Sequence, residues 1–216
     1  MPSGNVTVTV QTAELGTVVR NTSEGEQTCL ALRGGAYDWT AYSRSKNLFW
    51  YATTEDTTIP TSILVKGNMH AKLYLTEGTT LVCPNIYVEE GSTLTIEGEG
   101  ALVADATGEL FDADPDNQYF RAGIGGGGNI VIRGGNITAK GRLFGAGIGG
   151  GSPHSGDGTG GYSGDVTISG GTVTALGGGH AAGIGSTFRE NCGVIAISGG
   201  TVNAIGGAGG AGIGGG

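Results

Sequence analysis

The sequence predicts an all-β fold, a right-handed parallel β-helix (a solenoid) with an irregular N-terminal cap. The first observation is an internal repeat, in which the tetrapeptide Ala-Gly-Ile-Gly begins at Ala122, Ala146, Ala182 and Ala211. The second is a related block of residues that recurs at 129–139, 165–175 and 194–204. Repeats of this length indicate a solenoid, in which each repeat covers the hydrophobic face of its neighbour. The handedness is expected from the crossover rule for parallel strands.

Each repeat has room for three short strands. The block contains two runs of alternating aliphatic residues joined by a Gly-Gly pair, and Ala-Gly-Ile closes the unit. Alternation with period two is typical of a strand with one buried face, and glycine permits the positive φ of a sharp turn. Three strands in about 24 residues fit one coil of a parallel β-helix. The residues expected to point inward are Ile130, Ile132, Ile137, Ala139 and Ile148, stacked over Val166, Ile168, Val173, Ala175 and Ile184.

The first half of the chain carries the same alternation with less glycine. Strands are expected at 63–65, 71–75, 80–82, 86–88, 94–96 and 101–103. We therefore assign residues 61–216 to the β-helix, with glycine-rich repeats from residue 122, and residues 1–60 to an N-terminal cap that includes a strand at Asn5–Val10. A cap is expected because the end of a solenoid exposes its core and its strand edges.

Composition excludes several classes of protein. The 216 residues include 47 glycines, yet 38% of the chain is hydrophobic, so neither a collagen-like nor a disordered chain fits. The net charge of -8 argues against a nucleic-acid partner or an anionic membrane surface, since both require a basic face. No apolar run approaches the roughly 18 residues of a membrane span, so membrane insertion is not expected.

Three cysteines, Cys29, Cys83 and Cys192, are too few and too scattered for a zinc site or a disulfide framework. Free or buried thiols are therefore expected. A single bridge between Cys29 and Cys83 stays open as the alternative for an extracellular protein, because sequence does not determine the geometry of the pair.

One combination of motifs carries a resemblance to a known class of proteins. Residues 86–96, Ile-Tyr-Val-Glu-Glu-Gly-Ser-Thr-Leu-Thr-Ile, precede Gly-Ile-Gly-Gly-Gly units and Ile-Ser-Gly-Gly-Thr-Val-Thr-Ala. The combination resembles the glycine-rich parallel β-helix region of large bacterial cell-surface proteins, over roughly residues 60–216. The resemblance implies an extracellular stalk, an adhesin-like module or a carbohydrate-binding module, and it implies no catalytic residue. Because the chain ends inside a fourth unit, we expect a fragment of a longer repeat array.

An acidic segment is the candidate metal site. Asp112, Asp114 and Asp116 place three carboxylates at alternate positions, which is how loops supply oxygen ligands to Ca²⁺. The EF-hand pattern then fails, because Asn117 stands at position six and Gly123 at position twelve. A solvated acidic loop is the alternative, and no cofactor other than this candidate Ca²⁺ is expected.

An aromatic cluster is the candidate ligand-binding site. Its members are Tyr37, Trp39, Tyr42, Trp50 and Tyr51. Sugar rings stack on exposed aromatic faces, so the cluster favours binding of a glycan. The alternative is packing, in which the aromatics of the cap close the end of the solenoid core.

An enzyme of this fold would be a polysaccharide lyase or hydrolase. Hydrolysis requires two carboxylates across a groove, and a lyase requires a base beside Ca²⁺ or an arginine. Charged residues are sparse in the regular repeats, and Lys140 and Arg142 near the acidic segment are the best candidates for such a site.

We therefore expect a non-enzymatic extracellular module of a bacterial surface protein, acting as a rigid stalk or an adhesin-like domain. A carbohydrate-binding module and a polysaccharide-degrading enzyme are the alternatives. The stacked coils would hold loops such as 112–121 and 152–164 along one side, each contributing a weak contact to a glycan or a host-surface protein. The unpaired edge of the last coil also predicts self-association.

Overall fold

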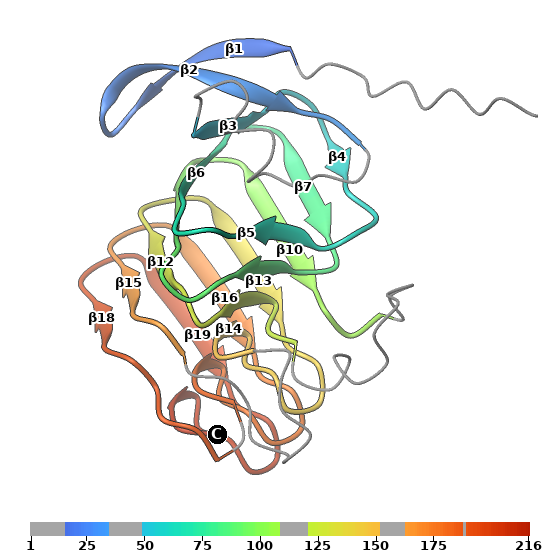
Figure 1. Ribbon diagram of the computed structural model, residues 1–216, viewed down its shortest axis with the longest axis vertical. Coiled ribbons are helices and arrows are strands. Elements are labelled where there is room, and N and C mark those ends of the chain that lie inside the picture. The colour runs from blue at the N-terminus through green and yellow to red at the C-terminus, as the bar shows by residue number, and fades with distance from the viewer. Residues whose placement is uncertain (1–15, 35–48, 109–120, 152–162, 188) are drawn as a thin grey trace, which may run out of the picture.

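The computed structural model describes residues 16–34, 49–108, 121–151, 163–187 and 189–216. These residues form strands and turns stacked along one axis, with the N-terminal strands at the top of Figure 1 and the C-terminus at the bottom. Among them there is no helix long and apolar enough to cross a membrane. The strands, in chain order, are β1 (Thr17–Thr22), β2 (Gly25–Leu32), β3 (Trp50–Thr53), β4 (Thr57–Thr58), β5 (Ile63–Val65), β6 (His70–Leu75), β7 (Thr80–Cys83), β8 (Ile86–Val88), β9 (Thr93–Gly98), β10 (Ala101–Asp105), β11 (Ile124–Gly126), β12 (Asn129–Ile132), β13 (Asn136–Lys140), β14 (Ile148–Gly149), β15 (Val166–Ile168), β16 (Thr172–Leu176), β17 (Ile184–Gly185), β18 (Ile195–Ile197), β19 (Thr201–Ile205) and β20 (Ile213–Gly214).

The strands assemble into three sheets, and each coil contributes one strand to each sheet. Sheet A has the order β1-β2-β3-β6-β9-β12-β15-β18, sheet C the order β19-β16-β13-β10-β7-β4, and sheet B the order β20-β17-β14-β11-β8-β5. Coil 1 is β3-β4-β5, and the chain repeats this path through sheets A, C and B until coil 6, β18-β19-β20. Successive coils pair in parallel register, which confirms the predicted parallel β-helix and its three strands per repeat.

An antiparallel hairpin closes the N-terminal end. Strands β1 and β2 pair with each other, and residues Leu30–Leu32 of β2 pair in parallel with Tyr51–Thr53 of β3. The inward side chains of β2, Leu30 and Leu32, are buried, so the hairpin covers the top of the core. The first coil therefore begins at β3 rather than at the predicted residue 61. The strand predicted at Asn5–Val10 lies outside the described residues.

The interior is one continuous column of aliphatic side chains. The predicted registers hold, because Ile130 pairs with Val166, Ile137 with Val173, and Ile148 with Ile184. The ten inward residues predicted from the repeats are all fully buried. Burying one large aliphatic side chain stabilises a fold by about 1.5–3 kcal/mol, so these columns are the main stabilising feature of the coils.

The outer face of sheet C forms a second set of columns. Thr80, Ala101, Asn136, Thr172 and Thr201 are successive partners in register across five coils. Strands within a sheet lie about 4.8 Å apart, so the column is a regular outward-facing row along the solenoid axis.

Candidate functional site

The residues of the predicted aromatic cluster do not form one exposed binding surface among the described residues. Tyr37, Trp39 and Tyr42 lie outside the described residues. Tyr51 points into the core and is fully buried, whereas Trp50 faces outward on β3 but is only 5% exposed. A ring without an exposed face has nothing to offer a sugar, so Trp50 and Tyr51 serve packing, which was the alternative for this cluster.

Trp50 is covered by the N-terminal hairpin. It packs with Cys29 of β2 and Ala52 of β3 in a small cluster on the outer side of sheet A. The Lys72 ammonium lies 5.3 Å from the centre of the Trp50 ring and donates to both carboxylate oxygens of Glu24, at 2.6 and 2.8 Å. The hydrogen bond from Lys72 holds the pKa of Glu24 below its ordinary value. The Glu24 carboxylate is 40% exposed, so this pair adds at most about 1 kcal/mol to stability.

A buried carboxylate fixes the tip of the same hairpin. Glu97, on the outer side of β9, is only 5% exposed. Its oxygens accept hydrogen bonds from the Ser23 backbone N–H at 2.8 Å and from the Ser23 hydroxyl at 2.5 Å. Arg133 Nη1 donates to the Ser23 hydroxyl at 2.7 Å and lies 3.9 Å from Glu97 Oε2. These contacts join the tip of the hairpin to coils 3 and 4, whereas its strand β2 pairs with β3 of coil 1.

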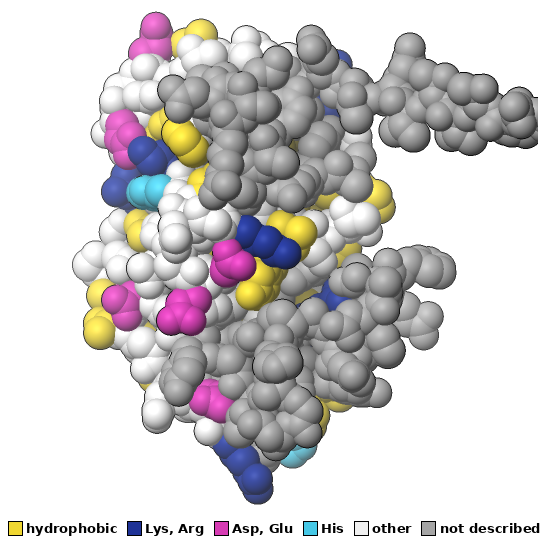
Figure 2. Space-filling view, viewed as in Figure 1, with side chains coloured by type: hydrophobic (Ala, Val, Ile, Leu, Met, Phe, Trp, Pro, Cys, Tyr) yellow, Lys and Arg dark blue, Asp and Glu magenta, His cyan; other side chains and the backbone are white. Residues whose placement is uncertain are grey.

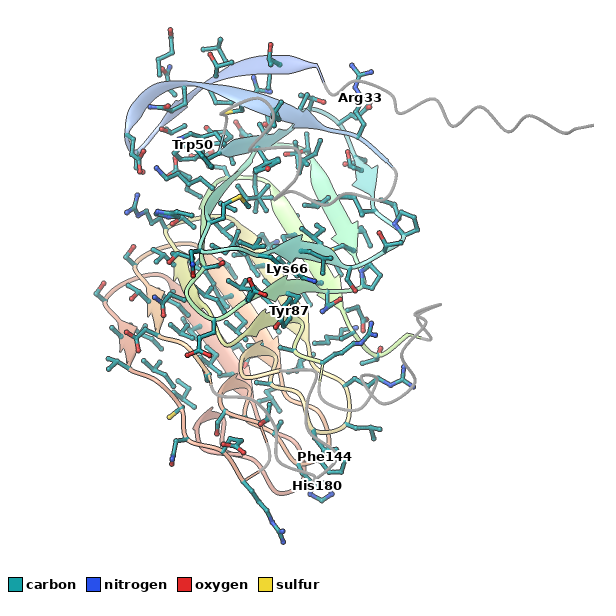
Figure 3. The ribbon with its side chains drawn as sticks, viewed as in Figure 1. Arg33, Trp50, Lys66, Tyr87, Phe144 and His180 are labelled. Carbon is teal, nitrogen blue, oxygen red and sulfur yellow. The ribbon has the colours of Figure 1, made fainter. Side chains whose placement is uncertain are left out.

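The described histidines make structural contacts. His70 Nε2 lies 2.8 Å from Thr95 Oγ1 on the neighbouring strand of sheet A. Partial loss of water around the ring, together with the nearby Lys72 charge, lowers the pKa of His70. His180 stacks on Phe144 with ring centres 5.6 Å apart, as the labelled pair at the lower end of Figure 3 shows.

The predicted calcium ligands Asp112, Asp114 and Asp116 lie outside the described residues. The residues that flank this segment are engaged with each other. Lys140 Nζ donates to Asp105 Oδ2 at 2.8 Å, and Arg142 Nη1 donates to the Gly108 carbonyl at 2.8 Å. Across the described part of the chain, no group of three or more His, Cys, Asp or Glu residues is placed to hold a metal ion.

Asp105 is an ordered acid at the start of that segment. Burial opposes its ionisation, but hydrogen bonds from Lys140 and Thr107 outweigh burial and lower the pKa of Asp105. Lys140, one of the two candidates for an enzyme site, is therefore paired with an ionised carboxylate.

The cysteines are free thiols, as expected. Cys83 faces the core from β7 and Cys29 lies in the outer cluster under the hairpin, so the alternative bridge between them is not formed. Burial raises the pKa of Cys29 to about 11 and that of Cys83 to about 12. Cys192 is exposed.

A shallow trough of about 390 Å³ runs along the corner between sheets A and C. Its lining residues are Gly98, Glu99, Arg133, Gly134, Gly135, Asn136, Gly171 and Thr172. Successive Gly-Gly turns form its floor, and a Cβ at Gly134 would lie only 2.6 Å from the Gly98 carbonyl oxygen. The corners therefore approach one another too closely for side chains, and the floor is bare backbone.

Polar groups stand along this trough. The guanidinium of Arg133, the carboxylate of Glu99, the amide of Asn136 and the hydroxyl of Thr172 all belong to exposed residues. Such groups donate and accept hydrogen bonds in the manner that sugar hydroxyls require. This trough was not predicted from the sequence, although the Gly-Gly pairs that recur at equivalent repeat positions indicate stacked corners.

A contact between a cation and an aromatic ring lies on sheet B, where Lys66 and Tyr87 point toward each other from neighbouring coils (Figure 3). The Lys66 ammonium lies 5.8 Å from the centre of the Tyr87 ring. Burial, reinforced by the nearby Glu89 carboxylate, raises the pKa of Tyr87. Figure 2 shows acidic and basic side chains interspersed on this face, so its described residues form no patch of a single sign.

Three segments of the chain, 130–152, 166–188 and 195–216, match a family model described as Beta helix repeat. Each match begins at the sheet A strand of a coil and extends past its sheet B strand, so the matches coincide with coils 4, 5 and 6. No curated protein and no solved structure matches the chain. The repeat matches and the three sheets of parallel-stacked coils agree, and the chain is a parallel β-helix.

Proposed function

We propose that this β-helix is a non-enzymatic module of an extracellular bacterial surface protein, in which the stacked coils serve as a rigid spacer that presents loops. The observation that carries the proposal is the unbroken core. One cluster of buried side chains extends from Leu30 in β2 to Ile184 in β17, so the described residues form a core without a break at which the stack could bend freely. The resemblance to surface-protein repeats supports the extracellular location.

The positions of the longest connections support presentation of loops. Residues 109–120 connect β10 of sheet C to β11 of sheet B, and residues 152–162 connect β14 of sheet B to β15 of sheet A. Both segments therefore adjoin a strand of sheet B in the order of the chain. Several weak contacts held at fixed spacing on a stiff support give a larger combined affinity than each contact alone.

Spin labels on one column of sheet C would test the rigid spacer. In a Cys192→Ser background, Thr80→Cys and Thr201→Cys place labels four strand spacings apart, about 19 Å, on the same register column. Insertion of two extra copies of residues 166–194 after Val194 is expected to lengthen the distance to about 29 Å and to keep the distribution narrow. A broad distribution, or a distance that does not increase, would refute the rigid spacer.

The non-enzymatic part of the proposal has its own test. Incubation with a panel of neutral and acidic polysaccharides is expected to release neither reducing ends nor unsaturated uronates. If the protein does degrade a polysaccharide, and Lys140→Ala abolishes that activity, the segment flanked by Asp105 and Lys140 is catalytic.

The trough between sheets A and C favours a second function, that of a carbohydrate-binding module. Its exposed polar groups and bare floor form an open strip along the axis, on which an extended glycan could lie. In this second function the glycan would contact Glu99, Asn136 and Thr172 rather than the buried Trp50 and Tyr51.

A glycan array probed with and without Ca²⁺ would test this second function. For any glycan that binds, Thr172→Ala is expected to weaken binding, because its hydroxyl lines the trough. Thr174→Ala is the matched control, since Thr174 lies on the same outer face of β16 but outside the trough. Equal effects of both changes would exclude the trough, and loss of binding on removal of Ca²⁺ would direct attention to Asp112, Asp114 and Asp116.

A further inference from the structure

Two Gly-Gly corners of the trough carry backbone N–H groups with no acceptor in the described part of the chain. In the corner of coil 3, the N–H groups of Glu99 and Gly100 both donate to a carbonyl oxygen of coil 2 at 3.0 Å. The N–H groups of Gly134 and Gly135 in coil 4, and of Gly171 in coil 5, make no such bond to any described residue. These three glycines line the trough and are partly exposed, so water satisfies their N–H groups until a ligand replaces it.

The shape of these corners suits an oxygen atom of a ligand. Gly135 and Gly171 have φ of 91° and 82°. Successive N–H groups in turns of this kind form a concave surface that binds an oxygen atom. The carbonyl oxygen of Gly135 is already engaged, because it accepts a hydrogen bond from the Thr172 N–H of the next coil at 2.9 Å. The floor of the trough therefore offers hydrogen-bond donors to a ligand.

The rim of the trough adds an acceptor. Glu99 is exposed, and its carboxylate makes no hydrogen bond to a described residue. A carboxylate accepts hydrogen bonds and does not donate them. A floor of donors beside a rim that accepts is complementary to an amide group, which carries one C=O acceptor and one N–H donor.

Charge argues against an anionic ligand at this place. Arg133 is the one cation that lines the trough, and its Nη1 atom already donates to the Ser23 hydroxyl at 2.7 Å. Two carboxylates accompany it, since Glu97 lies 3.9 Å from Arg133 and Glu99 lines the trough. The whole chain has a net charge of -8, so an acidic ligand would be repelled. An uncharged carbonyl oxygen is the acceptor that fits these donors.

An amide of this kind belongs either to a peptide or to the acetamido group of an amino sugar. Peptide strands are recognised by backbone hydrogen bonds together with pockets for alternate side chains. The residues that line the trough are glycines and polar residues, and none of them is hydrophobic, so there is no such pocket. The lining therefore favours a sugar.

We propose that the trough binds a glycan that contains N-acetylated amino sugars. The acetamido carbonyl accepts hydrogen bonds from the N–H groups of Gly134, Gly135 or Gly171, and the acetamido N–H donates to Glu99. The proposal rests on the carbohydrate-binding function above and adds the class of sugar. Because strands of neighbouring coils lie about 4.8 Å apart, an extended glycan along the axis passes both corners.

Isothermal titration calorimetry with matched tetrasaccharides would test the class of sugar. The probes are tetra-N-acetylchitotetraose, cellotetraose, which has the same backbone with hydroxyl in place of acetamido groups, and tetragalacturonate, which is acidic. The acetylated probe is expected to bind at least about tenfold more tightly than cellotetraose, because cellotetraose lacks the carbonyl and the N–H. Failure of the acetylated probe to bind, or tighter binding of tetragalacturonate or of an acetylated tetraglycine peptide, would overturn the proposal.

Variants of the rim separate an amide ligand from an anion. Glu99→Ala is expected to weaken binding of the acetylated probe about fivefold, whereas Glu99→Gln keeps an acceptor and weakens it less. Glu77→Ala is the matched control, since Glu77 is an exposed residue in the corner of coil 2 and does not line the trough. Tighter binding by Glu99→Gln would indicate an anionic ligand and overturn the proposal.

The floor is tested without a substitution, because a Cβ at Gly171 would lie only 2.6 Å from the Gly135 carbonyl oxygen. The acetylated probe is expected to shift the amide NMR signals of Gly134, Gly135 and Gly171 and to leave that of Gly78, in the corner of coil 2, unchanged. Unshifted floor signals at saturation would overturn the proposal.

The outcomes distinguish this proposal from the function on which it rests. If cellotetraose binds as tightly as the acetylated probe and Thr172→Ala weakens both, the class of sugar is wrong and the carbohydrate-binding module stands. If no glycan of the array binds, both are overturned.

Discussion

Comparison of Val173→Ala with Val82→Ala would measure how much the buried inward-facing side chains stabilise the coils. Val173 lies on β16, is fully buried, and stacks between Ile137 and Val202 of the neighbouring coils. Val82 lies on β7 of the same sheet, but it faces outward and is 37% exposed. Valine is changed to alanine at both sites, so the difference in strand propensity between valine and alanine is the same in both variants. The difference between their losses of stability therefore reports the burial of the side chain.

The expected costs differ clearly. Val173→Ala removes two methyl groups, worth about 0.8 kcal/mol each, and leaves a cavity between two coils, for a total of about 2–3 kcal/mol. Val82→Ala leaves a gap that is open to water, and we expect a cost below about 1 kcal/mol. In a domain of this size, 1 kcal/mol shifts the midpoint of thermal unfolding by about 2–4 °C.

Urea and thermal unfolding followed by circular dichroism would measure both variants. The midpoint is expected to fall by about 4–12 °C for Val173→Ala and by less than about 4 °C for Val82→Ala. Equal losses, or a larger loss for Val82→Ala, would refute the assignment of inward and outward faces.

Three further predictions concern the hairpin, the ion pair between Asp105 and Lys140, and the thiols. Glu97→Gln weakens the hydrogen bonds that hold Ser23, so hydrogen exchange in residues 17–32 is expected to quicken while coils 4–6 stay protected; Glu99→Gln is the exposed control, and equal effects would contradict the anchoring role. Because its pKa is lowered in the folded state, Asp105 contributes stability above its ordinary pKa of 3.8 and loses it as the pH falls through the folded value. Lys140→Ala is therefore expected to lower the thermal midpoint near pH 7 and to have a smaller effect as the pH falls below 3.8, and an equal effect at neutral and acidic pH would contradict the ion pair. Cys192 is expected to react with a thiol reagent in the folded protein, whereas burial delays Cys29 and Cys83 until unfolding, and three fast thiols would contradict their placement.

The coils were predictable because their stability is local and repetitive. Ile130, Val166 and Ile195 recur at equivalent repeat positions, and a one-residue slip would turn every aliphatic side chain outward. The strands at 63–65 and 86–88 were also predicted at their observed bounds, since turn residues flank both. Period-two alternation and glycine turns were sufficient information for these elements.

The hairpin and the aromatic residues were harder to predict because long-range contacts decide them. Ser23 meets Glu97, a residue 74 positions away, and no local pattern in the sequence indicates that contact. Alternation along β3 sends Tyr51 into the core and Trp50 outward. The hairpin residue Cys29 packs on Trp50, and alternation along β3 does not indicate that contact. The trough beside Asn136 and Thr172 was also hard to predict, because its shape depends on how successive corners stack in three dimensions.

In-register stacking of the coils underlies the rigid spacer, and a pair of engineered cysteines measures this stacking directly. Thr138 and Thr174 are register partners on adjacent strands of sheet C, whereas Thr138 and Asn203 are two coils apart. Strand neighbours lie about 4.8 Å apart, within the range of a disulfide, and a separation of about 9.6 Å is too long. In a Cys192→Ser background, mild oxidation is expected to link Thr138→Cys to Thr174→Cys within one chain and to leave Thr138→Cys with Asn203→Cys reduced. A bond in the second pair but not in the first would contradict the stacking of the coils.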